Sequence, residues 1–193
     1  MHYPLIVALP PSTSYDELAD RLDDAMSPFY EYRDTEYVDA DGELLPNGKW
    51  DHYTIGGLYR GFFLARPGAE PTDLITIQET KDRRYCNGGR VRGLDLEGMR
   101  ADAARLLAGS RPKTTAAEAD MHWDDILTWV RDTAIPTGAV LSHTGEWIAP
   151  DDARFVSMPF THRPEHLAFL TNANDYLDSL PGDAVLMIVE CHT

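Results

Sequence analysis

The chain carries one strongly apolar segment near each end. "YPLIVAL" (3–9) stops at Pro10-Pro11, and "DAVLMIVEC" (183–191) lies close to the C-terminus. Short, continuous apolar runs of this kind are typical of strands that are buried on both faces of a sheet. We therefore expect the two segments to be neighbouring central strands of one sheet, around which the rest of the chain builds its core.

Several segments between these strands have the periodicity of helices with one buried face. In the first, Ser14 and Glu17 have capping-box spacing, and the apolar residues up to Met26 recur at intervals of three and four. Three further helices are predicted: 94–109, with Leu96, Met99, Ala103 and Leu106 on one side; 115–133, which begins with a second capping-box pair; and 163–180, with Pro164 near its first turn.

The remaining segments predict short strands and turns. We expect strands at "HYTI" (52–55) and "LYRGFFLA" (58–65), a strand or loop at 73–79, and a hairpin at 139–150 with His143-Thr144-Gly145 as its turn. Residues 27–49 read as a long connection. Because the order is not a regular βαβ alternation, the sequence favours an α+β fold: a mixed, mainly antiparallel sheet with helices on one face. More specifically, we expect a single domain over 1–193, with a ferredoxin-like core and a loop-rich insertion at 27–93.

Charge and composition limit the classes of function. The formal net charge is −15, which argues against nonspecific nucleic-acid binding. No apolar run is long enough to span a membrane, the N-terminus lacks the features of a signal peptide, and two cysteines are too few for a disulfide scaffold. These features predict a cytoplasmic protein. Residues 16–43 contain eleven acidic residues and only two arginines, so an acidic DNA mimic remains an alternative.

The segment "NGKWDHYTIGGLYRG" (47–61) is the first candidate site. Adjacent glycines allow positive φ angles or a close approach to the backbone, and backbone N–H groups in such turns bind anions. Trp50 and Tyr53 would enclose a flat ligand, Asp51 or His52 would hydrogen-bond it, and Arg60 would balance its charge beside Gly56 and Gly57. The alternative is a strand bend or bulge packed under Trp50.

The basic segment 81–92 is the second candidate site. Its five cations, Arg84 and Arg90 among them, surround Asn87-Gly88-Gly89 and would hold a phosphate or an acidic partner. The alternative is a solvated turn whose arginines pair with the surplus acids.

Motifs for dinucleotides, nucleoside triphosphates and serine hydrolases are absent from the sequence, so we predict no cofactor. A metal site could draw on His52, His143 or His192, but no HExxH or CxxC pattern supports it, and we predict none.

Four stretches together resemble a family of small uncharacterised proteins of actinobacteria and their bacteriophages: "KWDHYTIGG", "LDLEGMR", "TGEWIAP" and "LPGDAVLMIVECH". Trp50, Asp51, Tyr53, Ile55, Gly56 and Gly57 match the family's first segment. Leu58 and Tyr59 replace its Arg-Trp pair, and Arg60 is the residue next to them. The resemblance implies a phage or actinobacterial source and a compact intracellular domain, and it brings no activity with it.

These observations predict an accessory protein that acts by binding. Its partner would be a host protein or a small anionic, nucleotide-like ligand, contacted through the segment from Trp50 to Arg60. One alternative is an enzyme acting on a nucleotide-like substrate, with His52, Asp51 and Arg60 as the reactive group. The other is the acidic DNA mimic. Two titratable groups that converge within about hydrogen-bond distance in a pocket would favour the enzyme, whereas a flat exposed Trp/Tyr patch would favour a partner surface.

Overall fold

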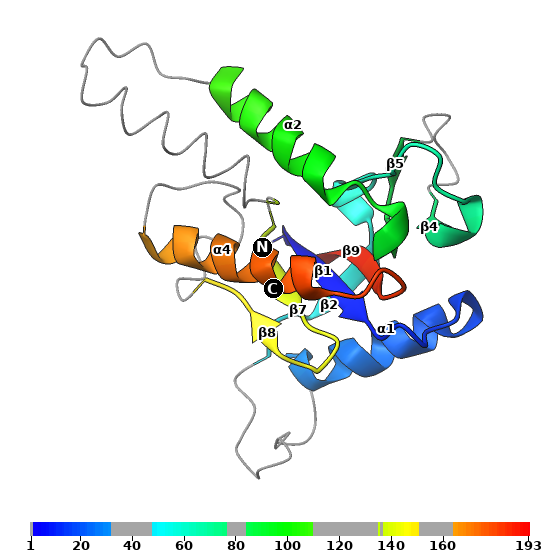
Figure 1. Ribbon diagram of the computed structural model, residues 1–193. Helices are drawn as coiled ribbons and strands as arrows, with labels where there is room; N and C mark the ends of the chain where they lie inside the picture. Colours follow the sequence, from blue (N-terminus) through cyan, green and yellow to red (C-terminus); the bar gives the residue numbers. More distant parts are fainter. Residues whose placement is uncertain (1, 32–47, 77–83, 110–134, 136, 151–163) are drawn as a thin grey trace.

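The two apolar ends of the chain pair with each other in the computed structural model, which describes residues 2–31, 48–76, 84–109, 135, 137–150 and 164–193 (Figure 1). Strand β1 (His2–Leu9) runs antiparallel to β9 (Val185–His192), from His2 opposite His192 to Leu9 opposite Val185. Residues 5–9 and 185–189 are buried, as strands covered on both faces must be. The prediction of neighbouring central strands is confirmed.

Within the described residues, seven strands form the main sheet. Its order is β4-β6-β9-β1-β7-β8, and β2 also pairs with β9. The pairing of β1 with β7 is parallel, and every other pairing in this sheet is antiparallel. The additional strands are β2 (His52–Ile55), β4 (Leu74–Ile75), β6 (Gly88–Arg90), β7 (Ala139–Leu141) and β8 (Trp147–Ile148). The α+β prediction is therefore confirmed, while its ferredoxin-like detail is not.

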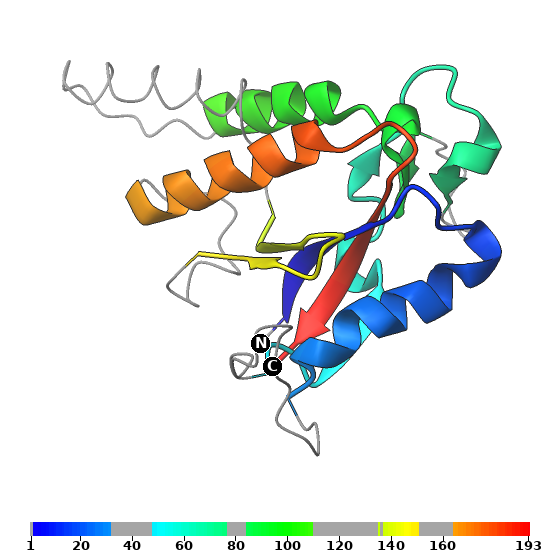
Figure 2. The same ribbon diagram turned by 60° about the horizontal axis from the view of Figure 1, so that its bottom comes forward.

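Helices cover both faces of the sheet. Helices α2 (Leu96–Gly109) and α4 (Pro164–Ser179) pack over the face that carries Ile6 and Ile188. Helix α1 (Leu18–Met26) packs over the opposite face (Figure 2), with Leu22 and Met26 in one cluster with Leu5, Val7 and Val189. The expectation of helices on one face is wrong, because β1 and β9 present apolar side chains on both sides and each side must be shielded from water.

Two local predictions also need correction. The α1 region begins with a 3₁₀ turn, η1 (Tyr15–Glu17), where the Ser14 hydroxyl donates to the Glu17 carboxylate at 3.1 Å rather than capping a backbone N–H. The expected strand 58–65 is replaced by a 3₁₀ turn, η3 (Gly57–Tyr59), and by β3 (Phe63–Leu64), which pairs with β5 (Tyr85–Cys86) in a separate sheet. The positive φ angles of Gly56 and Gly57, 73° and 50°, turn the chain away from β9.

The predicted hairpin is confirmed as β7 and β8, with a turn closed by a bond from the Ser142 N–H to the Glu146 carbonyl at 2.8 Å. The predicted helix 115–133 and most of the connection 27–49 lie outside the described residues. Among the helices that are described, none is long and apolar enough to cross a bilayer.

Strands β6 and β2 lie end to end along one edge of β9, and this arrangement positions the candidate site. Residues 185–187 of β9 pair with β6, whereas residues 189–192 pair with β2. Between them, the Ile188 N–H donates to the Asn87 carbonyl at 2.8 Å, and the Ile188 carbonyl accepts from the Gly56 N–H at 2.9 Å. The glycine pair therefore lies where one partner strand of β9 gives way to the other.

Candidate functional site

The aromatic side chains of the first candidate site face the interior. Trp50 is 9% exposed, and its indole N–H donates to the Met26 carbonyl at 3.1 Å. The ring of Tyr53 meets the indole edge-on, with centroids 5.0 Å apart, and the Tyr53 hydroxyl donates to the Asp23 carboxylate on α1. The two rings thus contribute to the packing between α1 and the sheet, and they do not form an exposed patch.

Two of the protein's own side chains, Glu190 and Asn87, lie against the glycine turn (residues 56–59). The Leu58 N–H donates to Glu190 Oε2 at 2.7 Å, and the nearby Gly61 N–H donates to Asn87 Oδ1 at 2.9 Å. A Cβ atom on Gly57 would overlap the Glu190 carboxylate, and one on Gly56 would lie 2.9 Å from the Asn87 amide. The anion beside this turn is therefore Glu190, and the close approach that the glycine pair suggests is made from within the protein.

Three histidines lie side by side next to this turn. In the strand register His192 of β9 is opposite His2 of β1 on one side and opposite His52 of β2 on the other. Directly opposed residues point to the same face of a sheet, so these side chains form one row, which we call the histidine row (His2, His192 and His52). The ring centroids of His2 and His192 are 4.8 Å apart.

A carboxylate contacts the Nδ1 atom of two of the three imidazoles, those of His2 and His192. Nδ1 of His2 lies 2.6 Å from Glu190 Oε1, and Nδ1 of His192 lies 2.8 Å from Asp51 Oδ1. The two histidine side chains are 52% and 40% exposed, while the carboxylates behind them are 12% and 23% exposed. The hydrogen bond from His192 holds the pKa of Asp51 below its usual value. A carboxylate at Nδ1 sets the tautomer and orientation of a ring and leaves Nε2 to exchange protons.

The third histidine has a different local contact. His52 is exposed, and its Nε2 lies 3.3 Å from the Thr54 hydroxyl on the same strand. Arg60, also exposed, directly follows η3. The first candidate segment therefore contributes Asp51, His52 and the glycine turn to this region, while Trp50 and Tyr53 pack against α1.

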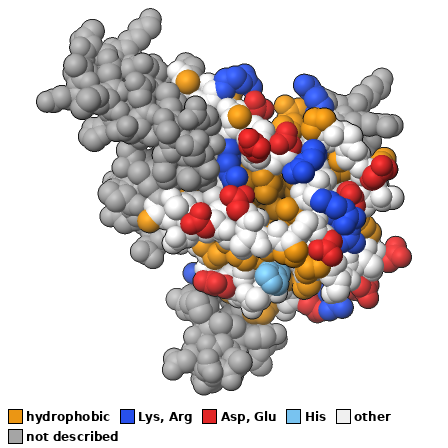
Figure 3. Space-filling view, viewed as in Figure 1, with side chains coloured by type: hydrophobic (Ala, Val, Ile, Leu, Met, Phe, Trp, Pro, Cys, Tyr) orange, Lys and Arg blue, Asp and Glu red, His pale blue; other side chains and the backbone are white. Residues whose placement is uncertain are grey.

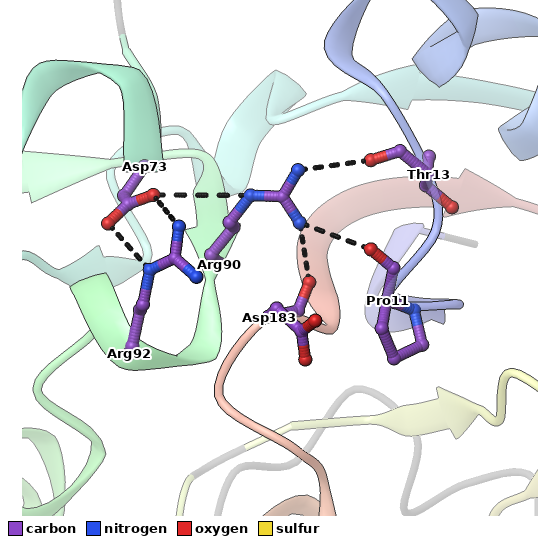
Figure 4. A network of polar contacts seen from close by, with 6 residues as sticks. All are labelled: Pro11, Thr13, Asp73, Arg90, Arg92 and Asp183. Carbon is purple, nitrogen blue, oxygen red and sulfur yellow. Dashed lines mark hydrogen bonds and ion pairs between the residues drawn. The ribbon is translucent and has the colours of Figure 1, made fainter.

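Arg90 of the second candidate site connects separate elements of the fold (Figure 4). Its guanidinium donates to the carbonyls of Asp183 at 2.6 Å, Thr13 at 3.3 Å and Pro11 at 3.4 Å. It also lies 4.0 Å from the Asp73 carboxylate, which accepts two hydrogen bonds from Arg92. The contacts of Arg90 and Arg92 with Asp73 fit the alternative that arginines of this segment pair with acids, whereas the carbonyl contacts of Arg90 were not predicted.

Arg84 is exposed, and its guanidinium lies 5.6 Å from the centroid of the Tyr85 ring. Residues 81–83 are outside the described part of the chain. On the face seen in Figure 3, basic and acidic side chains are interspersed, so in that view the described residues form no continuous patch of either sign. The acidic segment 16–43 is described only as far as residue 31.

Sequence reasoning missed His2 and Glu190, and it considered His192 only as a metal ligand. The available signal was the pairing of the two terminal strands, but an apolar run does not by itself fix the register that sets His2 opposite His192. His143 lies elsewhere, with its Nδ1 2.9 Å from the Tyr176 hydroxyl. Among the described residues, no group of three or more His, Cys, Asp or Glu side chains has the arrangement of a metal site.

Comparison of the chain with protein-family models, with curated proteins and with solved structures found no match. The resemblance to small actinobacterial and phage proteins therefore stays a prediction, and the geometry of the histidine row is the best guide to function.

Proposed function

We propose that this protein is an enzyme that hydrolyses a phosphate ester of a small, nucleotide-like substrate, with His2 and His192 as its acid–base pair. One observation carries the proposal: two adjacent, half-exposed imidazoles each have a carboxylate at Nδ1. Inward-facing Trp50 and Tyr53 favour this alternative over a flat aromatic partner surface. Imidazole suits the task because its ordinary pKa lies near neutrality, so it can both accept and donate a proton there.

The proposed chemistry divides proton transfer between the two rings. Nε2 of one imidazole accepts a proton from a water molecule as its oxygen bonds to phosphorus. Nε2 of the other, protonated, imidazole donates a proton to the ester oxygen as the bond from that oxygen to phosphorus breaks. Alcohol and phosphate leave, and exchange with solvent restores both rings. Glu190 and Asp51 keep the rings oriented, and the imidazolium adds attraction for an anionic substrate.

The direct test measures hydrolysis of nitrophenyl phosphate mono- and diesters and of nucleoside phosphates. We expect a bell-shaped pH dependence of kcat/KM, and a loss of about 10²–10⁴-fold in kcat for His2→Asn and for His192→Asn. His143→Asn is the matched control, because that histidine contacts Tyr176 away from the row. Wild-type rates in both row variants, or no turnover of any of these esters by the wild-type protein, would refute the proposal.

A second candidate is the predicted binding protein, which would hold an anionic ligand without transforming it. It is favoured by the exposure of the His2 and His192 imidazoles, and by Leu58, whose backbone N–H contacts Glu190 and whose 73% exposed side chain offers apolar contact area. Stabilisation of the wild-type protein by nucleotides or sugar phosphates in a thermal-shift screen, without turnover and absent in His192→Asn, would select this candidate.

We further propose a cytoplasmic location. Cys86 and Cys191 are free thiols in the structure, as a reducing compartment allows.

A further inference from the structure

We infer that the glycine turn is a positioning element for His2, and that Gly57 is the residue that makes this possible. The turn acts through Glu190, which lies between the turn and the imidazole. The catalytic meaning of this inference rests on the proposed function, but the contacts themselves are tested separately below.

Glu190 connects the turn to His2 through its two carboxylate oxygens. Oε2 accepts from the Leu58 N–H at 2.7 Å, and Oε1 lies 2.6 Å from His2 Nδ1. The carboxylate is 12% exposed. A carboxylate that has lost most of its water needs such partners, so the Leu58 N–H and the imidazole together stabilise it in one orientation. The orientation of the His2 ring therefore depends on a backbone amide of the turn.

A backbone hydrogen bond fixes the glycine turn to strand β9. The Gly56 N–H donates to the Ile188 carbonyl at 2.9 Å, and the Tyr59 N–H donates to the Gly56 carbonyl at 2.8 Å. The Tyr59 hydroxyl donates to the His2 carbonyl at 3.4 Å, so the turn also contacts the main chain of His2. The contact of Leu58 with Glu190 and that of Tyr59 with His2 both originate in η3, and the backbone of β9 anchors that turn.

Gly57 cannot carry a side chain while this arrangement persists. Its φ of 50° lies in the left-handed region, and a Cβ there would overlap Glu190 Oε2 and lie 2.8 Å from Glu190 Cβ. A methyl group at this position must therefore displace the carboxylate from the Leu58 N–H, and with it the acceptor of His2 Nδ1. Gly56 provides a matched comparison, because a Cβ there meets Asn87 instead.

The test follows the His2 ring by ¹⁵N NMR of the imidazole nitrogens, which distinguishes the Nδ1–H from the Nε2–H tautomer. For the wild-type protein we expect neutral His2 to be mainly in the Nδ1–H form. In Gly57→Ala we expect a shift toward the Nε2–H form, with the His192 signals retained. Gly68→Ala, which introduces the same residue at a φ of 80° in open space, should leave His2 unchanged. Gly56→Ala should affect His2 less than Gly57→Ala does.

Glu190→Ala removes the carboxylate without altering the turn backbone, so it tests the same link if Gly57→Ala does not fold. It should produce the same change in the His2 tautomer. If the protein is the proposed enzyme, both variants should also lower kcat about 10–100-fold with little change in KM. A wild-type His2 tautomer in Glu190→Ala would overturn the positioning role. Absence of wild-type turnover would refute the proposed function, and the NMR result would still decide whether the turn positions His2.

Discussion

Replacing Arg90 with alanine should lower the free energy of unfolding by about 2–3 kcal/mol. Arg90 joins the loop after β1, Asp183 two residues before β9, and η4 (Pro71–Asp73), and its side chain is 18% exposed. Hydrogen bonds from a charged donor contribute roughly 1.5–3 kcal/mol each. The bond to the Asp183 carbonyl, at 2.6 Å, should contribute within this range, whereas those at 3.3 and 3.4 Å are longer and should add less.

Urea unfolding monitored by circular dichroism measures this loss, which corresponds to a decrease in Tm of roughly 4–12 °C for a chain of this size. Arg90→Lys should fall between alanine and the wild type, because an ammonium group cannot reproduce the planar fork of the guanidinium. Arg105→Ala is the control, since Arg105 is 71% exposed and pairs with Asp102 in the same helix.

Equally small decreases in the free energy of unfolding for Arg90→Ala and Arg105→Ala would refute the reasoning. A wild-type stability of Arg90→Ala combined with weaker binding of phosphate would restore the sequence-based prediction that Arg90 contacts a ligand.

Two further predictions concern titratable groups. Hydrogen bonds from Arg92, with the nearby charge of Arg90, hold the pKa of Asp73 below its usual value. The ionised carboxylate therefore stabilises the native state at pH values above the pKa of Asp73 in the unfolded chain, about 3.9. This stabilisation is lost as the pH falls through the lower pKa of the folded protein. The difference in unfolding free energy between the wild type and Asp73→Asn should therefore shrink as the pH is lowered from about 7 to about 2.5; a constant difference in urea titrations would contradict this. Burial raises the pKa of the Cys191 thiol to about 12 and that of Cys86 to about 11, so neither should react with a thiol reagent at about pH 8 in the native protein, and both should react after denaturation. Rapid labelling of either native thiol would show that the surrounding core opens.

Local patterns in the sequence determined most of the elements. The apolar runs at the two ends identified β1 and β9, and three-to-four periodicity identified α1, α2 and α4. The turn residues between 141 and 147 identified the β7–β8 hairpin. These signals are readable because periodicity and turn chemistry depend on residues that are close in sequence. The same reasoning failed at 58–65, where an apolar, aromatic composition suggests a strand but two left-handed glycines redirect the chain.

At the candidate site, too, the sequence predicted the local segment but not the contacts between distant strands. The sequence singled out the segment from Trp50 to Arg60, and Asp51, His52 and Gly57 do lie at the histidine row. It did not distinguish a glycine turn that receives a ligand from one that receives Glu190. That distinction depends on which side chain the partner strand presents to the turn, a property of the register between distant strands.

The sequence by itself therefore determined most of the strands and helices, and that the two ends of the chain lie together. Tertiary structure alone decided that helices cover both faces, that β2 and β6 share one edge of β9, and that His2, His192, Asp51 and Glu190 converge. The physical reason is that register and strand order arise from long-range pairing, in which residues from opposite ends of the chain become neighbours. A shift of one residue along β9 would turn His192 to the opposite face and separate this group.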